Sequence, residues 1–163
     1  MKSGPRSHCP ISLALEAIGD KWSLLILRDL ILRGKQRYQE LLHSEERIST
    51  NILADRLIRL EHDGLISKVA DPGDGRQYRY IPTQKALDLL PVIAEMARWT
   101  AKYDPTIDKM HPFFQRVKAG NEEFVRETLA QLESRGNHDA LPGTRRTAVG
   151  PSTRTRRDRS HRG

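Results

Sequence analysis

Residues 48–82 read ISTNILADRLIRLEHDGLISKVADPGDGRQYRYIP and carry the clearest pattern in the chain. Ser49 or Thr50 is a favourable N-cap for a helix that continues to about Asp63. The apolar positions of this predicted helix recur at helical spacing and are Leu53, Leu57 and Leu60. Gly64 then supplies the left-handed residue that commonly ends a helix. An apolar segment, a turn at residues 71–76 and a second segment at 78–82 predict a β-hairpin.

Residues 37–42 precede this stretch and predict another short helix, with Tyr38, Leu41 and Leu42 facing the core. A polar link at residues 43–47 joins the two helices, which is the arrangement of a helix-turn-helix. With a glycine-rich basic hairpin after it, the order becomes that of a winged helix-turn-helix. The sequence therefore predicts a mainly α fold with a small β-hairpin wing.

Two further helices are predicted before this motif. The first covers residues 11–18, with Ile11, Leu15 and Ile18 on one face, and Gly19 ends it. The second covers residues 22–32, is apolar almost all round, and has Asp20 as its N-cap and Gly34 as its end. Such a helix is expected to be buried on most sides.

Residues 84–103 predict one long helix, capped by Thr83 and kinked at Pro91, whose nitrogen cannot bond back to Leu87. One apolar stripe suits the core and contains Leu87, Leu90, Ile93 or Ala94, and Ala97. The other needs a different surface and contains Leu89, Val92, Met96, Trp99 and Tyr103. With Ile11 and Leu15 it predicts a homodimer formed through the terminal helices. The alternative is that both stripes serve one broad intramolecular core.

The C-terminal part divides into two segments. Acidic residues after Asn121 favour a helix that ends near Gly136, and we expect it to pack on the long helix or on the dimer. Residues 137–163 contain almost nothing apolar and predict disorder. The predicted organisation is an N-terminal arm at 1–8, the winged domain at 9–104, a helical extension at 105–135 and a disordered Arg-rich tail at 136–163.

Composition limits the classes of function. Of the formal net charge of +7, residues 135–163 hold eight Lys and Arg against two acids, whereas residues 1–134 hold 20 against 19. Any nucleic-acid contact in the folded part must therefore come from local clustering. No segment suits a membrane span, and the single cysteine suits a reducing cytoplasm. The six histidines are scattered without metal-ligand spacing, so we expect no metal, no cofactor and no enzyme activity.

The segment from Cys9 to about Tyr103 resembles the HxlR family of bacterial transcriptional regulators, which are related to the MarR group. The matching patterns are Cys9-Pro10, Gly19-Asp20-Lys21-Trp22, Leu25-Ile26-Leu27-Arg28, Arg37-Tyr38-Gln39-Glu40-Leu41, Ile48-Ser49, Leu57 to Leu60-Glu61, Asp63-Gly64-Leu65-Ile66, Tyr80 to Thr83, and Leu89-Leu90-Pro91-Val92. Their ordered combination makes the resemblance specific. Asp20 and Ala86 stand where the family commonly has glycine, and residues 71–76 replace a proline-rich wing.

The resemblance implies a homodimer that binds an inverted-repeat operator on double-stranded DNA, often as a repressor, in the cytoplasm at the nucleoid. Family members respond to small molecules or oxidants, in some cases through an N-terminal cysteine. Cys9 is therefore a candidate sensor, with Arg6 and His8 close enough in sequence to favour its thiolate. The alternative is a cysteine buried as a small apolar side chain.

Within this frame, the predicted helix after Ile48 is the recognition helix. We expect its DNA-contacting residues to be Ser49, Thr50, Asn51, Asp55, Arg56 and Arg59. Asn pairs well with adenine and Arg with guanine, while Asp55 is expected to orient Arg59 or Arg56. The alternative is an ordinary solvated helix face.

The wing and the start of the first helix of the motif supply further candidates. Arg76 and Arg79 are predicted minor-groove or phosphate contacts, although a plain hairpin would use the same glycines, and Arg37 is a predicted phosphate contact. The tail arginines either add salt-sensitive affinity or only improve solubility. Two alternatives to a sequence-specific regulator stay open, namely an architectural DNA-binding protein and a winged helix used for protein contact.

Overall fold

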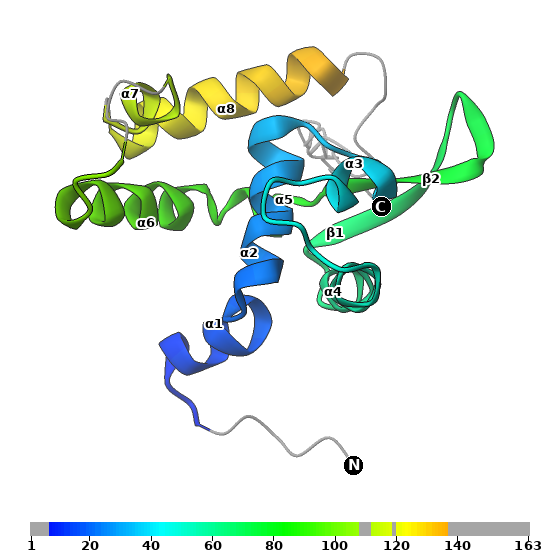
Figure 1. Cartoon of the computed structure of the whole chain (residues 1–163), viewed down its shortest axis with the longest axis horizontal. Helices are drawn as coiled ribbons and strands as arrows, with labels where there is room; N and C mark the ends of the chain where they lie inside the picture. Colours follow the sequence, from blue (N-terminus) through cyan, green and yellow to red (C-terminus); the bar gives the residue numbers. More distant parts are fainter. Residues whose placement is uncertain (1–6, 108–111, 119, 137–163) are drawn as a thin grey trace, which may run out of the picture.

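The computed structural model describes residues 7–107, 112–118 and 120–136. The predicted tail beyond Gly136 and most of the N-terminal arm lie outside these residues. In Figure 1 the β1–β2 hairpin projects from one side of the molecule, and α6, α7 and α8 lie on the other. The predicted fold class, mainly helical with a hairpin wing, is confirmed. No helix of the described ranges is long and apolar enough to cross a membrane.

Helices α1 (Pro10–Ile18) and α2 (Lys21–Arg28) form the N-terminal scaffold. The carboxylate of Asp20 accepts hydrogen bonds from the amides of Trp22 and Ser23, so the predicted N-cap is confirmed. The sequence predicts one helix to residue 32, but its last turn is the π-helix η1 (Asp29–Arg33). Gly34 ends it with φ of 68°, as expected for a left-handed cap.

Helices α3 (Tyr38–Leu42) and α4 (Thr50–His62) form the helix-turn-helix. The hydroxyl of Ser49 accepts a hydrogen bond from the amide of Ile52 at 3.4 Å, so Ser49 is the N-cap and Thr50 the first helical residue. The predicted core leucines of α4 are all buried, at 0–2% exposure: Leu53, Leu57 and Leu60. Gly64, at φ of 70°, follows the helix as predicted.

The wing consists of β1 (Ile66–Asp71) and β2 (Asp74–Pro82), paired antiparallel with Ile66 opposite Pro82 and Asp71 opposite Asp74. The predicted six-residue turn is therefore wrong, because only Pro72 and Gly73 lie between the strands. A carboxylate oxygen of Asp71 accepts a hydrogen bond from the amide of Gly73 at 2.9 Å. This contact, with an irregularity in register beside Asp71, closes the hairpin tightly.

The prediction of one long helix at residues 84–103 is also wrong in one respect. This segment divides into α5 (Gln84–Leu87) and α6 (Leu90–Tyr103), with Pro91 in the first turn of α6. Proline has no amide to donate and is well tolerated in the first turn, so the chain starts a new helix there. The two predicted stripes separate largely as expected: Leu90, Ile93 and Ala94 are buried, whereas the other stripe is exposed at Val92, Met96, Trp99 and Tyr103 and half-buried at Leu89.

Helices α7 (Pro112–Lys118) and α8 (Asn121–Gly136) follow α6 and pack against it. Arg98 of α6 donates to the carbonyl of Val117 and to the side chain of Asn121. Val117 and Phe124 are buried in the same core as α2 and α4. The sequence predicted α8 and its packing on the long helix, but not α7.

Candidate nucleic-acid interface

The start of α4 is held by contacts with α3. The hydroxyl of Tyr38 donates to the carbonyl of Thr50 at 3.0 Å. Ser49, Thr50 and Asn51 are all exposed. The predicted contacts at the N-terminal end of the recognition helix therefore lie together on the surface, beside the first free amides of the helix.

The outward line of α4 runs from Asn51 through Asp55 to Ile58, since residues four and seven apart share a face. Asn51 and Asp55 are exposed, as predicted, and the Asp55 carboxylate pairs with the neighbouring Arg56 guanidinium. Ile58 is 69% exposed on the same line. The sequence analysis did not select Ile58, although an isoleucine outside the Leu53–Leu57–Leu60 stripe was a readable signal.

Arg56 joins α4 to the start of α2. Its Nε lies 2.9 Å from a carboxylate oxygen of Asp20, the N-cap of α2. Burial alone would raise the pKa of Asp20, but hydrogen bonds from Ser23 and Arg56 outweigh this effect and lower it. Arg56 is thus half-buried, and its guanidinium is shared between Asp20 and Asp55.

Arg59 turns towards α1. Its guanidinium donates to the carbonyl of Glu16 and lies 3.8 Å from the carboxylate of Asp63. Both arginines predicted for base recognition therefore lie on the side of α4 that faces the N-terminal helices. Arg59 is still exposed and stands four residues after Asp55, and the contact of both arginines with DNA stays a prediction.

Arg37 and Arg79 fasten the wing to α3. The Nε of Arg37 lies 2.7 Å from Asp71, at the end of β1, and the hydrogen bond lowers the pKa of that carboxyl while it raises the pKa of Arg37. Arg79 donates to the side chain of Gln36 at 3.3 Å, and the backbone of Arg37 forms a bridge with that of Arg79. The Arg37 side chain is still 49% exposed, so it can also reach a phosphate.

The sequence predicts Arg76 in the turn at residues 71–76, at the tip of the wing, but the structure places it in a strand. It lies within β2, beyond the Pro72–Gly73 turn, and does not form the tip of the wing. Its side chain is exposed, and its amide donates to the carboxylate of Asp74 at 3.0 Å. Arg76 therefore presents its charge from the outer part of the hairpin.

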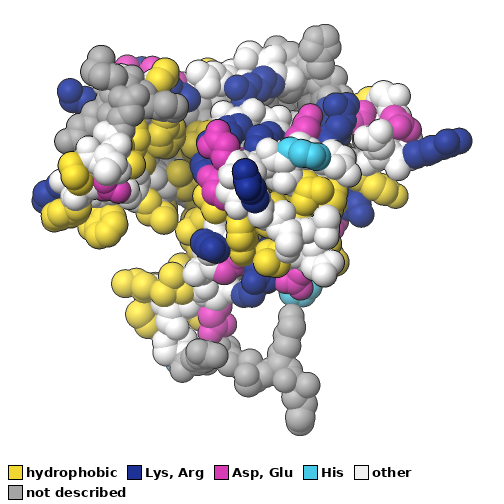
Figure 2. Space-filling view, viewed as in Figure 1, with side chains coloured by type: hydrophobic (Ala, Val, Ile, Leu, Met, Phe, Trp, Pro, Cys, Tyr) yellow, Lys and Arg dark blue, Asp and Glu magenta, His cyan; other side chains and the backbone are white. Residues whose placement is uncertain are grey.

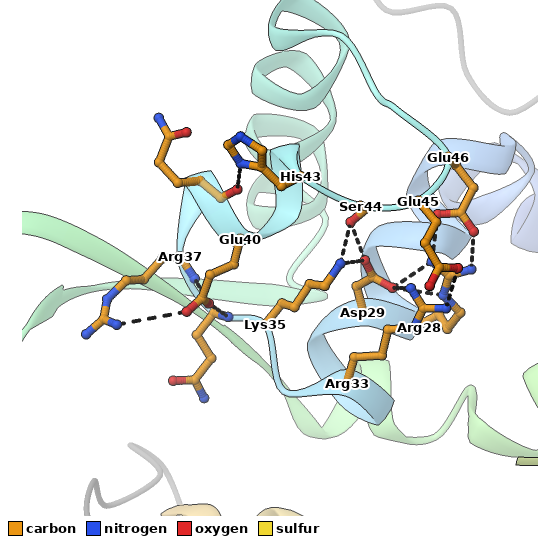
Figure 3. Close-up of polar contacts among 12 residues, drawn as sticks. Arg28, Asp29, Arg33, Lys35, Arg37, Glu40, His43, Ser44, Glu45 and Glu46 are labelled. Atoms are coloured by element: carbon orange, nitrogen blue, oxygen red, sulfur yellow. Dashed lines mark hydrogen bonds and ion pairs between the residues drawn. The ribbon is translucent and has the colours of Figure 1, made fainter. Parts of the chain in front are cut away.

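The buried carboxylate of Asp29 contacts the link between the two helices of the helix-turn-helix. Asp29 is 1% exposed and contacts the side chains of Arg28, Lys35 and Ser44, with Arg33 at 3.5 Å (Figure 3). Arg28 and Arg33 in turn pair with Glu46 and Glu45 in the link between α3 and α4. The sequence analysis missed this cluster, which an aspartate inside an apolar helix could have indicated.

The balance of effects on Asp29 favours its charged form. Burial alone would raise the pKa of this carboxyl, but hydrogen bonds from Ser44, Lys35 and Arg28 outweigh burial and lower the pKa. Since Ser44 belongs to the link before α4, the ionised carboxylate holds this link against η1.

Apolar side chains gather in two patches, one over α6 and one over α1, both on the side away from the wing (Figure 2). The predicted interface residues Ile11, Leu15, Val92, Met96, Trp99 and Tyr103 are 44–71% exposed, and Leu89 is half-buried. The rings of Trp99 and Tyr103 lie 5.6 Å apart. Leu89 packs partly against the core, whereas the other side chains of this group stay exposed among the described residues, and their role in a dimer stays a prediction.

Cys9 is exposed at the N-cap position of α1, and its amide donates to the hydroxyl of Ser7 at 3.2 Å. The alternative that Cys9 is buried as a small apolar side chain therefore does not hold in the single chain. Arg6, the predicted neighbour that would favour a thiolate, lies outside the described residues.

Comparisons with known proteins agree with this geometry. The uncharacterized HTH-type transcriptional regulator YdeP of Bacillus subtilis (strain 168) is 34% identical over 102 residues, which are 63% of this chain and 79% of YdeP. The crystal structure of PA1607, described as a transcription factor, matches with a TM-score of 0.58 and 33% identity, over 65% of this chain and 72% of that one. The redox regulator HypR in its oxidized form matches with a TM-score of 0.52 and 25% identity, over 60% of this chain and all of HypR.

A family model, HxlR-like helix-turn-helix, matches residues 17–108, which include the helix-turn-helix, the wing and α6. Together with the relatives that are named transcriptional regulators, the match identifies a transcriptional regulator with a helix-turn-helix DNA-binding fold. The chain belongs to the HxlR family.

Proposed function

We propose that this chain is a sequence-specific regulator that binds an inverted-repeat operator as a homodimer, acts as a repressor and responds to a small molecule or an oxidant. The observation that carries the proposal is the pairing of two separate surfaces. Asn51 and Asp55 lie on an exposed recognition helix beside a basic wing, and an unused apolar surface covers α1 and α6. One surface suits a DNA groove and the other suits a second copy. Such a protein would act in the cytoplasm, at the nucleoid.

The DNA-binding part is tested by selecting sites for the purified full chain from random duplexes. We expect recovery of an inverted repeat whose half-sites lie about one helical turn, roughly 34–36 Å, apart. Affinity for this repeat should exceed affinity for random duplex by about a thousandfold or more at physiological salt. Equal affinities at every salt concentration would instead favour the architectural alternative.

The dimer is tested by placing a charge in the apolar surface. Trp99→Asp, at a position 67% exposed on α6, should convert a dimer into monomers, because the carboxylate would be desolvated against the partner. Tyr78→Asp is the matched control, since Tyr78 is a 52% exposed aromatic residue on the wing. Sedimentation should show a monomer for Trp99→Asp and a dimer for Tyr78→Asp. A dimer for both variants would exclude Trp99 as an interface residue.

The effector part concerns Cys9. The exposed thiol at the start of α1 lies beside the proposed dimer surface, and HypR is named a redox regulator. A thiol oxidant or a quinone should therefore release the wild-type protein from its operator, and Cys9→Ser should remain bound. Unchanged release of the Ser variant would exclude Cys9 as the sensor and leave the DNA-binding proposal intact.

A further inference from the structure

The recognition helix α4 presents the apolar side chain of Ile58 to solvent, whereas the sequence predicts Arg56 and Arg59 as its outward contacts. Ile58 is 69% exposed and stands outside the buried core of the described residues. Arg56 is engaged with Asp20, and Arg59 with Glu16 of α1. The side of α4 that faces away from α1 and α2 is consequently short of cations.

Helix geometry places Ile58 almost in line with Asn51. Seven residues at about 100° each bring the two side chains within roughly 20° of one another, and about 10.5 Å apart along the axis. Arg59 lies about 100° further round and faces α1. Ala54, which is also exposed, stands one turn before Ile58. Asn51, Ala54 and Ile58 therefore lie together on the outward side of α4, beside Asp55, whose carboxylate is paired with Arg56.

The chemistry of the major groove includes one apolar group, the C5-methyl of thymine. From this placement on α4, and relying on the proposed DNA-binding function, we infer that Ile58 is a specificity-determining residue that contacts thymine methyl groups in each half-site. Asn51 can bond the N6 and N7 atoms of an adenine. Since the axis of a helix in the groove is inclined to the duplex axis, the separation of about 10.5 Å spans at most about three base pairs at roughly 3.4 Å each, so the thymine lies within about three pairs of that adenine.

The test uses the selected operator and removes one methyl group at a time. Each thymine is replaced by deoxyuridine, which lacks only the C5-methyl, and binding is measured for wild type, Ile58→Ala and the control Asp88→Ala. Asp88 is exposed, directly follows α5 in the sequence, and lies outside α4 and the wing. Ile58→Ala should fold normally, because the side chain is largely exposed and alanine favours a helix.

We expect one thymine per half-site at which uracil weakens wild type and Asp88→Ala about fourfold, the equivalent of one buried CH₂ group. Ile58→Ala should bind the thymine and uracil duplexes equally at that position. Identical uracil profiles for wild type and Ile58→Ala, including profiles with no effect anywhere, would overturn the inference while operator binding stands. Failure of wild type to prefer any sequence would overturn the proposed function and this inference with it.

Discussion

Asp29→Asn tests whether the buried carboxylate holds the helix-turn-helix together. The substitution keeps the shape of the side chain and removes its charge beside Lys35 at 2.9 Å and Arg28 at 2.6 Å. Breaking a buried ion pair by removing one partner costs about 3–5 kcal/mol. The partner side chains are 20–35% exposed, and Arg28 and Arg33 keep their glutamates. We therefore expect a loss of about 2–3 kcal/mol in the free energy of unfolding.

Thermal and denaturant unfolding at pH 7 measure this loss. For a chain of 163 residues, it corresponds to a fall of roughly 5–10 °C in Tm. Glu45→Gln is the matched control, because Glu45 pairs with Arg33 in the same cluster but its side chain is 79% exposed. The control should lose less than about 1 kcal/mol.

The pH dependence supplies a second measurement. The pKa of Asp29 is lowered in the folded state, so the unfolded chain takes up a proton first as the pH falls. The stabilising contribution is complete above the ordinary Asp pKa of about 3.9 and is lost as the pH falls through the lower folded-state value. The difference between wild type and Asp29→Asn should therefore be full at pH 7 and shrink below about pH 4. A variant as stable as the control at pH 7, with no pH-dependent difference, would refute the reasoning.

Three further substitutions test the packing of α8 and the backbone strain at Gly34. Phe124→Ala removes a fully buried ring that lies edge-on to Phe113, with ring centroids 6.0 Å apart. The free energy of unfolding measured with denaturant should fall by about 3–4 kcal/mol, and the association state should not change. A fall below about 1 kcal/mol would show that α8 is not part of the core. Gly34→Ala should cost about 1–2 kcal/mol because φ is 68°, while Arg135, whose guanidinium lies 2.8 Å from the added carbon, can move away. Gly75→Ala, which meets no atom within 4 Å, should change the unfolding free energy by less than about 0.5 kcal/mol, and equal effects of the two alanines would exclude backbone strain at Gly34.

The elements that the sequence predicted well have short-range causes. The cap at Asp20, the leucine stripe of α4 and the left-handed Gly64 each depend on residues within one or two turns. Periodicity also separated the buried and exposed stripes of α6, because burial follows directly from the helical repeat.

The differences have long-range or positional causes. Pro91 was expected to kink one helix, but the same residue is equally suited to begin a new one, and local pattern does not decide between them. Arg56 and Arg59 look free in the sequence, whereas their partners Asp20 and Glu16 lie 36 and 43 residues away. The Asp29 cluster likewise joins η1 to the α3–α4 link, and Asp29 and Ser44 lie 15 residues apart in the sequence. A local sequence pattern does not relate residues at that separation.

The fastening of the wing to α3 has a consequence for control of DNA binding. The hairpin is tied to the start of α3 by the Arg37–Asp71 ion pair, the Arg79–Gln36 contact and the backbone bond from Tyr80 to Gln36. We expect these contacts to make the hairpin and the helix-turn-helix move as one rigid body. A signal received elsewhere has little freedom to reshape that body. In the proposed homodimer, such a signal would instead alter the distance and tilt between two such bodies, so that both no longer match successive grooves of the same duplex.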